Sequence, residues 1–521
     1  MQRFVRTLTF LYTVLFALLL AAAAAGSVFL TVRFERNIEN DRPIYLPQNI
    51  PVTVLLAAVI LVVLSLVVKR TRISSKHLTA AALAVSLLLC LFFVGIVRGQ
   101  PTNDAAILDG IMRRFMAGDL SALTEESYLW VYPFQITYVF FGQILTALFG
   151  AGSYLPYQAL NVLSILLTIY YLQKITREIF QDEEICRIEA VLSMGLLFLF
   201  VYASFIYNDI WSFAPAAAGL YCLIRFLKEG RLSCGVWGAA LTALAVLIKS
   251  NVYIAVVAAE IVLLLSAAEE AAATETTSET ARRRRVTQKV IVMVLLLLLS
   301  RGFTGAVEKG YAQAAGLDAL PAGTTTRAYL AMGMREGDNT YGWYNGFNAE
   351  VIRESGYDTA RADAAAEEEI RTRLSYFGEH PKYAAKFYLY KYLSQWADPT
   401  CISLREYELT GRHAPFRTGA YDSVVFGAAG ELLWQLMNAF HLLLFITSCF
   451  FIWGWILRKK DPGKGIDRGL GLIVLYILGG MLFHQLWEAS GRYVMRYVLY
   501  LLPLSAAGID MLMKRIRKGN D

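Results

Sequence analysis

The sequence predicts an all-α polytopic membrane protein with about 12 transmembrane helices, and two observations carry the prediction. Of the 521 residues, 56% are hydrophobic and only 17% are charged, whereas about a quarter of the residues in a soluble domain are charged. The apolar residues also fall into runs of about 15 to 26, which is the length that spans the hydrocarbon core of a bilayer. A water-soluble core does not explain so many runs of this length.

The charged residues act as signals of membrane topology. The net charge is +7, from 49 basic and 42 acidic residues. A nucleic-acid-binding protein gathers such an excess on one soluble face. Here the basic residues form short clusters between apolar runs, which is typical of cytoplasmic loops. We therefore expect membrane lipid as a partner and no nucleic acid.

The first apolar stretch, residues 8–30, follows Arg3 and Arg6. It could be a cleaved signal peptide, but it is long for one, and an uncleaved span is the better interpretation. In either case the chain that follows starts outside the cytoplasm. Further apolar runs cover residues 52–68, 79–97, 131–150, 155–173, 187–207, 211–227, 235–268, 290–304, 432–457, 469–487 and 493–513.

The basic clusters all face the cytoplasm if two conditions hold. First, run 131–150 must not cross fully, but lie at or dip into the outer interface. Second, run 235–268 must cross twice, with a break at Lys249-Ser250-Asn251 like those of broken helices that line cavities. The result is 12 crossings in a plasma membrane, with both termini cytoplasmic. The clusters are residues 69–72, 174–177, 225–231, 282–285, 458–464 and 514–518.

Three regions follow from this topology. Residues 1–304 form a transmembrane catalytic core with an outer loop at 98–154, and residues 432–521 form the C-terminal transmembrane helices. Residues 305–431 are long enough for a small extracytoplasmic domain, with helices expected over 360–377 and 381–396. Of the six cysteines, only Cys401 lies in an outer segment, so we expect no intramolecular disulfide.

Asp104 is the first candidate for chemistry. It follows Asn103 just beyond the outer end of the third span, where an acid is costly unless it faces a cavity. It could be the general base that takes a proton from an acceptor hydroxyl. It could equally be the N-cap of the helix that follows. Asp109 and Asp119 are weaker candidates that we expect to be solvated.

Asp209 and Lys249 are the next two candidates. Asp209 closes the outer end of run 187–207 and would face the same side as Asp104, either as a second catalytic acid or as a helix cap. Lys249 stands in the middle of an apolar run, where a cation is expensive. It could hold a phosphate near the outer leaflet, or it could be a lysine that snorkels from a helix end.

A fourth group lies where the last two spans meet on the outer side. His484, Glu488, Arg492 and Arg496 are spaced by four and would form one stripe if the segment were helical, although Gly491 can break it. The arginines, with Tyr493 beside them, could bind a lipid phosphate while Glu488 orients them. The alternative is an ion pair between Glu488 and Arg492 that ties two helix ends together.

Several signatures of soluble enzymes are absent from the sequence. It has no P-loop, no dinucleotide glycine fingerprint, no serine elbow and no Asp-x-Asp pair for a metal-bound sugar nucleotide. No Cys/His spacing resembles a zinc site, so we assign no metal ligand and no cofactor, and leave a divalent metal open. A transferase of this composition would use a lipid-phosphate donor, which cationic side chains can bind.

These stretches resemble the GT-C superfamily of membrane glycosyltransferases, which includes protein O-mannosyltransferases and bacterial aminoarabinose transferases. The resemblance covers roughly the whole chain. In two places the chain departs from the usual pattern: Asn103-Asp104 replaces two adjacent acids, and Ser250-Asn251 follows the lysine. The stretches that carry the resemblance are residues 101–104, 117–120, 132–135, 247–251 and 484–493, and, for the outer loop of Gram-positive members, 332–334, 342–345 and 396–398.

The resemblance implies a GT-C-like fold with interfacial helices in the first outer loop, Asp104 as the base, and Lys249 and Arg492 as phosphate contacts. The expected activity is transfer of a mannose-type or glucose-type hexose from a polyprenyl-phosphate donor, with inversion, to an extracytoplasmic glycan, polymer or protein. Two alternatives stay open. One is a transporter or flippase for a lipid-linked or anionic solute. The other is a non-catalytic partner in the assembly of a cell-envelope polymer.

Overall fold

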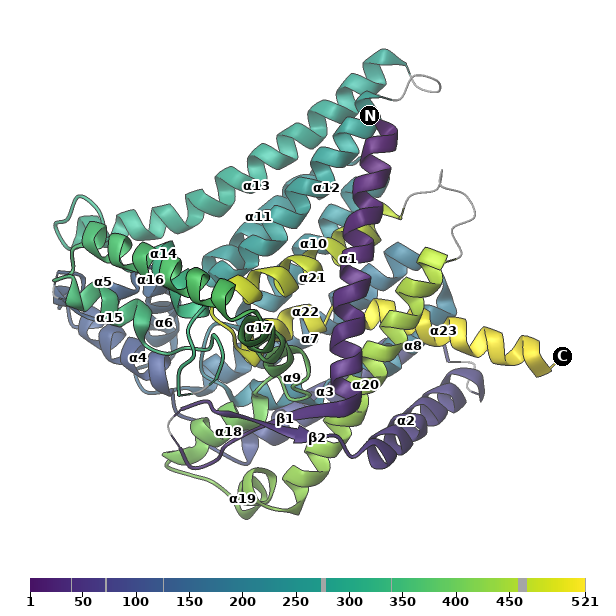
Figure 1. Cartoon of the computed structure of the whole chain (residues 1–521), viewed down its shortest axis with the longest axis horizontal. Coiled ribbons are helices and arrows are strands. Elements are labelled where there is room, and N and C mark those ends of the chain that lie inside the picture. Colours follow the sequence, from purple (N-terminus) through teal and green to yellow (C-terminus); the bar gives the residue numbers. More distant parts are fainter. Residues whose placement is uncertain are drawn as a thin grey trace.

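Long apolar helices make up most of the molecule (Figure 1). The computed structural model describes residues 1–38, 40–70, 73–124, 126–272, 278–338, 340–457 and 466–520, the side chains of 518–520 excepted. Over these residues the chain forms α1 to α23, a few 3-10 turns and one two-stranded hairpin. The predicted all-α polytopic membrane fold is therefore confirmed.

Nine helices in the described part of the chain are long and apolar enough to cross a membrane, and the number rises to twelve if each bent helix pair forms one span. The prediction of about 12 lies within this range. Two of the nine, α10 and α12, are counted together with the 3-10 turn before them. The nine are α1 (Gln2–Phe29), α2 (Ile50–Arg70), α3 (Ser75–Gly95), α7 (Leu155–Phe180), α10 (Phe213–Glu229), α12 (Tyr253–Ala271), α13 (Glu279–Ala314), α20 (Ala428–Leu457) and α21 (Arg468–Leu486).

The bent pairs mark where the backbone turns inside apolar sequence. The pair α8 (Glu183–Ser193) and α9 (Leu197–Val201, with a 3-10 turn to Ser204) bends by 46°, and α22 (Gly491–Val498) and α23 (Leu501–Asn520) bend by 51°. The third pair, which contains α5 (Tyr128–Val131) and α6 (Ile136–Phe149), bends by 111°. A turn of this size excludes one straight span through 121–149.

The run 235–268 breaks where the sequence predicts it. The helix α11 (Leu232–Ile248) ends immediately before Lys249, which is extended, with φ −148°. A single 3-10 turn over Ser250–Val252 then leads into α12. Both helices pack along α13, and Figure 1 shows them running in opposite directions. The break therefore reverses the chain and leaves a polar lysine at the turn.

Ion pairs hold several helix ends together at one end of the bundle. Arg517 in α23 pairs with Glu184 in α8, and Arg468 in α21 pairs with Glu269 in α12. Arg285 in α13 pairs with Glu270, also in α12. Both chain termini lie toward this side of the molecule (Figure 1). Two of the predicted basic clusters, 282–285 and 514–518, thus lie at this end. Cluster 458–464 and positions 71 and 72 of cluster 69–72 lie outside the described residues.

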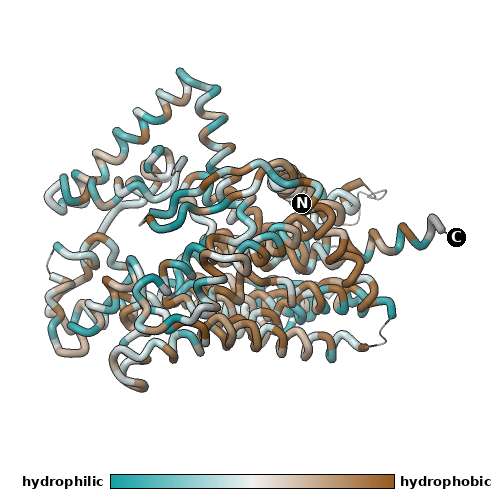
Figure 2. Tube along the Cα trace, turned by 90° about the horizontal axis from the view of Figure 1, so that it is seen from below, coloured by the Kyte–Doolittle hydropathy of each residue, from teal (hydrophilic) through white to brown (hydrophobic). Residues whose placement is uncertain are grey.

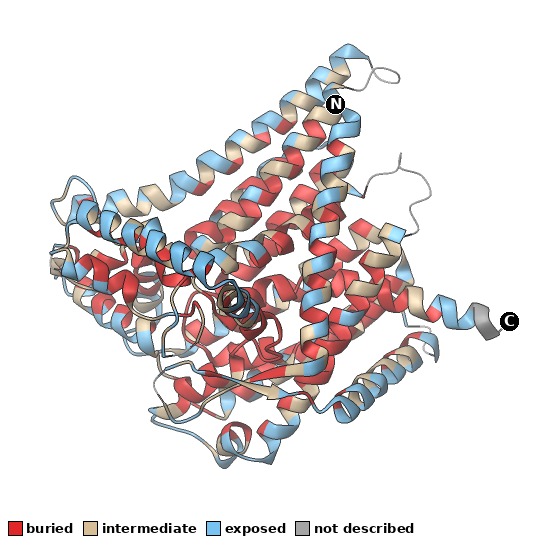
Figure 3. Cartoon of the chain, in the orientation of Figure 1, coloured by how far each residue is buried: buried red, intermediate tan, exposed pale blue. Residues whose placement is uncertain are grey.

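The other end of the bundle carries the outer segment. The two helices predicted in this segment, 360–377 and 381–396, are present as α16 and α17. The predicted boundary between the transmembrane core and this segment, at 304/305, falls inside α13. Figure 2 shows hydrophilic residues concentrated away from the termini, and Figure 3 shows exposed residues along α2, α13 and α16. The helices of the segment are α14 (Thr326–Gly333), α15 (Phe347–Glu354), α16 (Thr359–Glu379), α17 (Pro381–Trp396), α18 (Ser403–Arg412) and α19 (Gly419–Phe426).

The outer segment packs partly on itself and partly on the bundle. Met332 and Ile352 belong to one small cluster of buried side chains, and Phe377 and Phe387 belong to another. Other buried side chains of the segment, Trp396 among them, join the main core. The segment therefore contacts the bundle through its own hydrophobic side chains.

Two further elements flank the outer end. The strands β1 (Leu30–Phe34) and β2 (Pro43–Pro47) pair antiparallel, with Val32 opposite Tyr45, and join α1 to α2. This hairpin was not predicted. The helix α4 (Asn103–Met116) begins the predicted outer loop and packs on α6.

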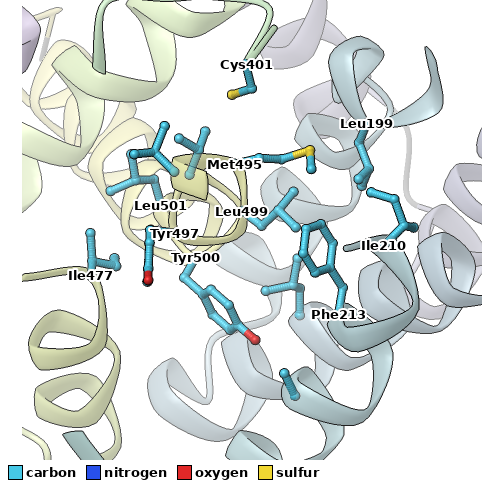
Figure 4. Close-up of a cluster of buried hydrophobic side chains, with 14 of the residues drawn as sticks. Leu199, Ile210, Phe213, Cys401, Ile477, Met495, Tyr497, Leu499, Tyr500 and Leu501 are labelled. Carbon is cyan, nitrogen blue, oxygen red and sulfur yellow. The ribbon is translucent and has the colours of Figure 1, made fainter. Parts of the chain in front are cut away.

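The core centres on the α22–α23 bend. Figure 4 shows Met495, Tyr497 and Leu499 surrounded by side chains from α9, α10 and α21, with Phe213 close to Leu499. Tyr497 is fully buried, and its ring centre lies 5.0 Å from that of Tyr476. This packing fixes α22, the short helix that carries Arg492.

Candidate functional site

Polar side chains meet where three helix breaks approach one another. The breaks are residues 205–209 before α10, residues 249–252 between α11 and α12, and residues 487–490 between α21 and α22. At a break, backbone groups lose their helical partners and polar side chains leave the apolar helix face. The structure brings together here six predicted residues: Asp209, Lys249, His484, Glu488, Arg492 and Tyr493.

Lys249 points at a buried carboxylate. Its Nζ lies 3.1 Å from Asp209 Oδ2 and 3.3 Å from Asn208 Oδ1, and it sits 4.2 Å from the centre of the Tyr207 ring. Asn208 in turn donates its Nδ2 to the carbonyl of Ile248 at 2.6 Å, which satisfies the end of α11. A snorkelling lysine would reach for the membrane surface, so this alternative is wrong. Asp209 occupies the N-cap position of the 3-10 turn before α10, as the helix-cap alternative expected, but its side chain makes no capping hydrogen bond.

Arg492 shares that carboxylate with Lys249. Its Nε lies 3.9 Å from Asp209 Oδ2, and its Nη1 lies 3.0 Å from Glu406 Oε1. Its guanidinium also lies 5.4 Å from the centre of the Tyr207 ring. One tyrosine ring and one carboxylate oxygen are therefore flanked by two cations.

Burial and charge set the pKa values of this cluster. Burial opposes ionisation of Asp209, but Lys249 and Arg492 outweigh it and hold its pKa below the usual range. Burial lowers the pKa of Lys249 in spite of Asp209. Burial raises the pKa of Glu406 to about 7, although Arg492 acts in the opposite direction. Burial opposes the charge of Arg492, but Glu406 and Asp209 raise its pKa. The cluster thus combines the lasting positive charge of Arg492 with a carboxyl group that titrates near neutrality.

The stripe hypothesis for residues 484–496 is wrong in its geometry. The helix α21 ends at Leu486 and α22 begins only at Gly491, so no single helix runs through the segment. The turn nevertheless brings these residues together. Tyr493 donates its hydroxyl to Glu488 Oε1 at 3.2 Å, and the ring of His484 stacks on that of Tyr493, 5.5 Å between centres.

Glu488 faces both the cations and Asp104. Burial raises the pKa of Glu488 to about 7, Arg492 lowers it, and the charge of Asp104 raises it further. The charges of the phosphate-binding candidates, Arg492 and Lys249, and of the candidate base, Asp104, thus all act on Glu488. The alternative interpretation of this segment, an ion pair between Glu488 and Arg492, is wrong, because Arg492 pairs with Glu406 instead.

Asp104 lies in the first turn of α4, which begins at Asn103. The N-cap position belongs to Thr102, so the helix-cap alternative for Asp104 is wrong. Burial raises the pKa of Tyr128, and the charges of Tyr207 and Asp104 raise it further. The ring of Tyr128 lies 4.9 Å from that of Tyr132. Tyrosines thus line this side of the cluster.

The two weaker acidic candidates lie apart from this cluster. Asp109 is not solvated as expected, because Arg113 and Tyr154 hold its Oδ2 at 3.0 and 2.9 Å. Asp119 is exposed and pairs with Arg114. Both acids are therefore engaged in local structural contacts.

A buried lysine of the outer segment holds the turn that carries Glu488. Lys391 Nζ donates to the carbonyls of Gly333, Gln485 and Trp487 at 2.5, 3.0 and 2.8 Å. Gly342, with φ +66°, packs against Lys391, since a Cβ there would lie 2.6 Å from its Cε. The family-like stretches 332–334 and 342–345 therefore build the support of this turn.

A second support carries Glu406. Cys401 and Ile402 both adopt left-handed backbone angles, with φ of 46° and 61°. Asp398 stabilises this bend, because its carboxylate accepts the backbone N–H groups of Thr400 and Ile402 at 2.9 and 2.6 Å. Gly491 packs against the same carboxylate. Two adjacent left-handed residues cost about 1–3 kcal/mol each, which is typical of backbone that serves a site.

Sequence reasoning missed Glu406 and Lys391. Glu406 stands between Arg405 and Tyr407 in a polar helix, and Lys391 stands among aromatic residues of α17. No local spacing marks either one. The stretch 396–398, next to both helices, was the only signal in the sequence.

Residues 135–281 match the sequence profile of a family described as dolichyl-phosphate-mannose-protein mannosyltransferase. This match supports the resemblance to the GT-C superfamily of membrane glycosyltransferases. The matched stretch contains Asp209 and Lys249, but neither Asp104 nor Arg492. No curated protein sequence matches the chain significantly.

The profile match indicates a glycosyltransferase, in a chain that is a multi-pass membrane protein. In the described part of the chain, no group of three or more His, Cys, Asp or Glu side chains could hold a metal ion. The positive groups at the cluster are the side chains of Lys249, Arg492 and Arg496.

Proposed function

We propose that this protein transfers a hexose from a polyprenyl-phosphate donor to an acceptor hydroxyl on the outer side of the plasma membrane. The observation that supports this most directly is the position of Lys249 and Arg492, which lie 3.1 and 3.9 Å from one oxygen of Asp209. Glu406 also pairs with Arg492, but burial raises the pKa of Glu406 to about 7, so this carboxyl group is partly protonated near neutral pH. The two buried cations therefore keep positive charge for an anionic ligand.

The donor phosphate binds at this pair of cations. An ammonium has three N–H donors, and a guanidinium offers a planar fork that suits phosphate oxygens. The Nε of Arg492 has no hydrogen-bond partner among the described residues. Asp209 acts as the shared counter-ion that keeps both cations in place before the donor arrives. We therefore assign Asp209 a positioning role in place of the acid–base role expected from the sequence.

The chemical step is a single displacement. Asp104 takes the proton of the acceptor hydroxyl, and the acceptor oxygen attacks the anomeric carbon from the face opposite the phosphate. The bond from that carbon to the phosphate oxygen breaks, and the polyprenyl phosphate leaves with the electron pair. Lys249 and Arg492 stabilise the charge that develops on it. One displacement inverts the anomeric carbon, so a retained configuration in the product would contradict this scheme.

The orientation in the membrane follows from the charges. The basic helix ends, such as Arg285 and Arg517, gather at the end of the bundle opposite the outer segment. By the positive-inside rule this end is cytoplasmic. Both termini are then cytoplasmic, and the outer segment, the Glu488 turn and Asp104 face the outside, where a glycan, polymer or protein acceptor is available.

The test is sugar transfer in membranes that contain the full chain and radiolabelled polyprenyl-phosphate hexose. We expect the wild type to move label to an acceptor. Asp104→Asn should lose transfer but still bind donor, whereas Lys249→Met should lose donor binding too. Asp119→Asn is the matched control, because Asp119 is an acid of the same loop that pairs only locally, and it should transfer normally.

Other outcomes point to the alternatives. If no label moves with any hexose, but the donor changes leaflet in reconstituted vesicles, the protein is a transporter and the transferase proposal fails. If transfer depends on the protein but Asp104→Asn leaves it unchanged, the chain acts as a non-catalytic partner.

A further inference from the structure

A second site lies on the far side of α18 from the catalytic cluster. A cavity of about 630 Å³ opens between the β1–β2 hairpin, α18 and the beginning of α20. Arg405 and Glu408 line it from α18, while Glu406 of the same helix faces away and pairs with Arg492. The helix α18 therefore separates this cavity from the cluster around Arg492, and a ligand in one does not extend into the other.

The cavity lies at the membrane boundary. Arg33 follows the end of α1 by four residues, and Leu46 precedes the start of α2 by four. Glu431 and Trp434 belong to the first turns of α20. The cavity is thus enclosed by chain at the outer ends of three candidate spans, the depth at which lipid headgroups lie.

The lining divides into a polar floor and an apolar mouth. Arg405 pairs with Glu408 at 2.9 Å, and both side chains are almost fully buried. Arg33 donates both terminal nitrogens to Glu431 at 2.8 Å and covers the Trp434 ring at 3.7 Å. The mouth is formed by exposed or half-exposed apolar side chains: Ile44, Leu46, Phe426 and Ala428.

Two charges at the rim remain available to a ligand. Arg36 is exposed and has no hydrogen-bond or ion-pair partner in the parts of the chain that the structure describes. Among the described residues, the carboxylate of its neighbour Glu35 pairs with Arg42, at 3.5 Å, and both side chains are exposed. The whole lining holds three arginines and three glutamates, so it carries no net charge. It differs in this from the cationic pair Lys249 and Arg492.

We propose that this cavity binds the headgroup of a zwitterionic phospholipid. Arg36 binds the phosphate, Glu35 binds the ammonium group, and the first acyl methylenes pack on Leu46 and Phe426. A purely anionic headgroup would meet Glu35, Glu408 and Glu431 without a compensating excess of cations. An uncharged sugar would offer no anion to the guanidinium of Arg36, whose charge acts on Glu431 without forming an ion pair with it. This site is distinct from the donor site and does not depend on the proposed transfer reaction.

The experiment compares lipids bound to the full chain in nanodiscs that hold equal amounts of phosphatidylethanolamine, phosphatidylglycerol and a glucosyl diacylglycerol. After transfer to detergent, native mass spectrometry counts the lipids retained by each protein. We expect the wild type to retain phosphatidylethanolamine in preference to the other two. Arg36→Ala and Glu35→Gln should each weaken retention about tenfold, the effect of one lost charge-assisted contact.

The matched control is Arg361→Ala, which removes an arginine that is 78% exposed on α16 of the outer segment. It should retain lipid like the wild type. Preference for phosphatidylglycerol would show an anion site, and preference for the glycolipid would show a sugar site; either overturns the proposal. So would equal retention of all three lipids, no retention, or an equal loss in Arg361→Ala. Both rim residues tolerate substitution because they are not part of the core, and unchanged thermal stability checks this.

Discussion

The two ends of the bundle both contain ion pairs, but of opposite kinds. At the end near the termini, Arg517 and Glu184 keep 48% and 28% of their side-chain surface exposed. At the candidate site, the side chains of Lys249 and Asp209 keep only 12% and 1% of their surface exposed. The first kind connects helix ends in water, whereas the second is enclosed by helices.

This difference separates structural from functional charge. An exposed pair contributes about 0–1 kcal/mol, because water and salt screen it. A buried pair gains more from attraction but loses hydration, so that an apolar replacement is often as stable. Because the membrane makes enclosed charges costly, we expect such charges to be retained for binding a ligand. The predictions below test this contrast, from the largest expected effect to the smallest.

Asp209→Asn should destabilise the protein most. It leaves Lys249 and Arg492 without their shared counter-ion, and removing one partner of a buried pair costs about 3–5 kcal/mol. Thermal unfolding in detergent measures the loss. The double variant Asp209→Asn/Lys249→Met removes one cation as well and should recover part of the stability. If the free energy of unfolding of Asp209→Asn falls by less than about 1 kcal/mol, the buried pair contributes no more than an exposed pair, and the contrast fails.

Arg492→Lys should impair donor binding while keeping the charge. A lysine cannot reach both Glu406 and a phosphate with a planar fork, so the KM for the donor should rise about 10- to 100-fold, or about 1.4–2.8 kcal/mol. Steady-state transfer against donor concentration measures it. An unchanged KM would remove Arg492 from the phosphate site. Arg412→Lys, in the Arg405–Glu408 network on the other side of α18, is the control.

The pH dependence should follow Glu488. Its pKa in the folded state is about 7, raised from the usual 4.5 by burial. A raised carboxyl pKa gives stability that is fully present below pH 4.5 and is lost as the pH rises through about 7. Unfolding measured from pH 4.5 to 8 should show a fall of about 3 kcal/mol, since one pKa unit corresponds to about 1.4 kcal/mol. Glu488→Gln should remove that part of the slope, and an identical slope in both proteins would exclude Glu488 as its source.

Arg517→Ala should have the smallest effect. Its pair with Glu184 is exposed, so the loss should stay below about 1 kcal/mol, with sugar transfer unchanged. The same two measurements used above check it. A loss as large as that of Asp209→Asn would erase the contrast between the two ends.

The sequence alone predicts those site residues whose charge stands in an apolar run, because the free-energy cost of such a charge can be recognised from its neighbours in the sequence. A lysine inside an apolar run and arginines beside a span stand out because the membrane penalises charge, and the break at 249–251 follows from the same residues. Glu406 and Lys391 do not stand out, since their partners lie 86 and up to 96 positions away. The β1–β2 hairpin was missed because two five-residue strands between spans carry little periodic signal.

The contacts of Lys391 have a consequence for engineering. Under the proposed function, a change of acceptor would be attempted by exchanging the outer segment for that of a relative. Lys391 belongs to that segment, yet its three hydrogen bonds end on carbonyls of Gly333, Gln485 and Trp487, two of which lie at the end of α21. A graft without an equivalent lysine would leave those carbonyls unbound and release the Glu488 turn. Chimaeras should therefore exchange α14 to α16 and keep α17 from the recipient.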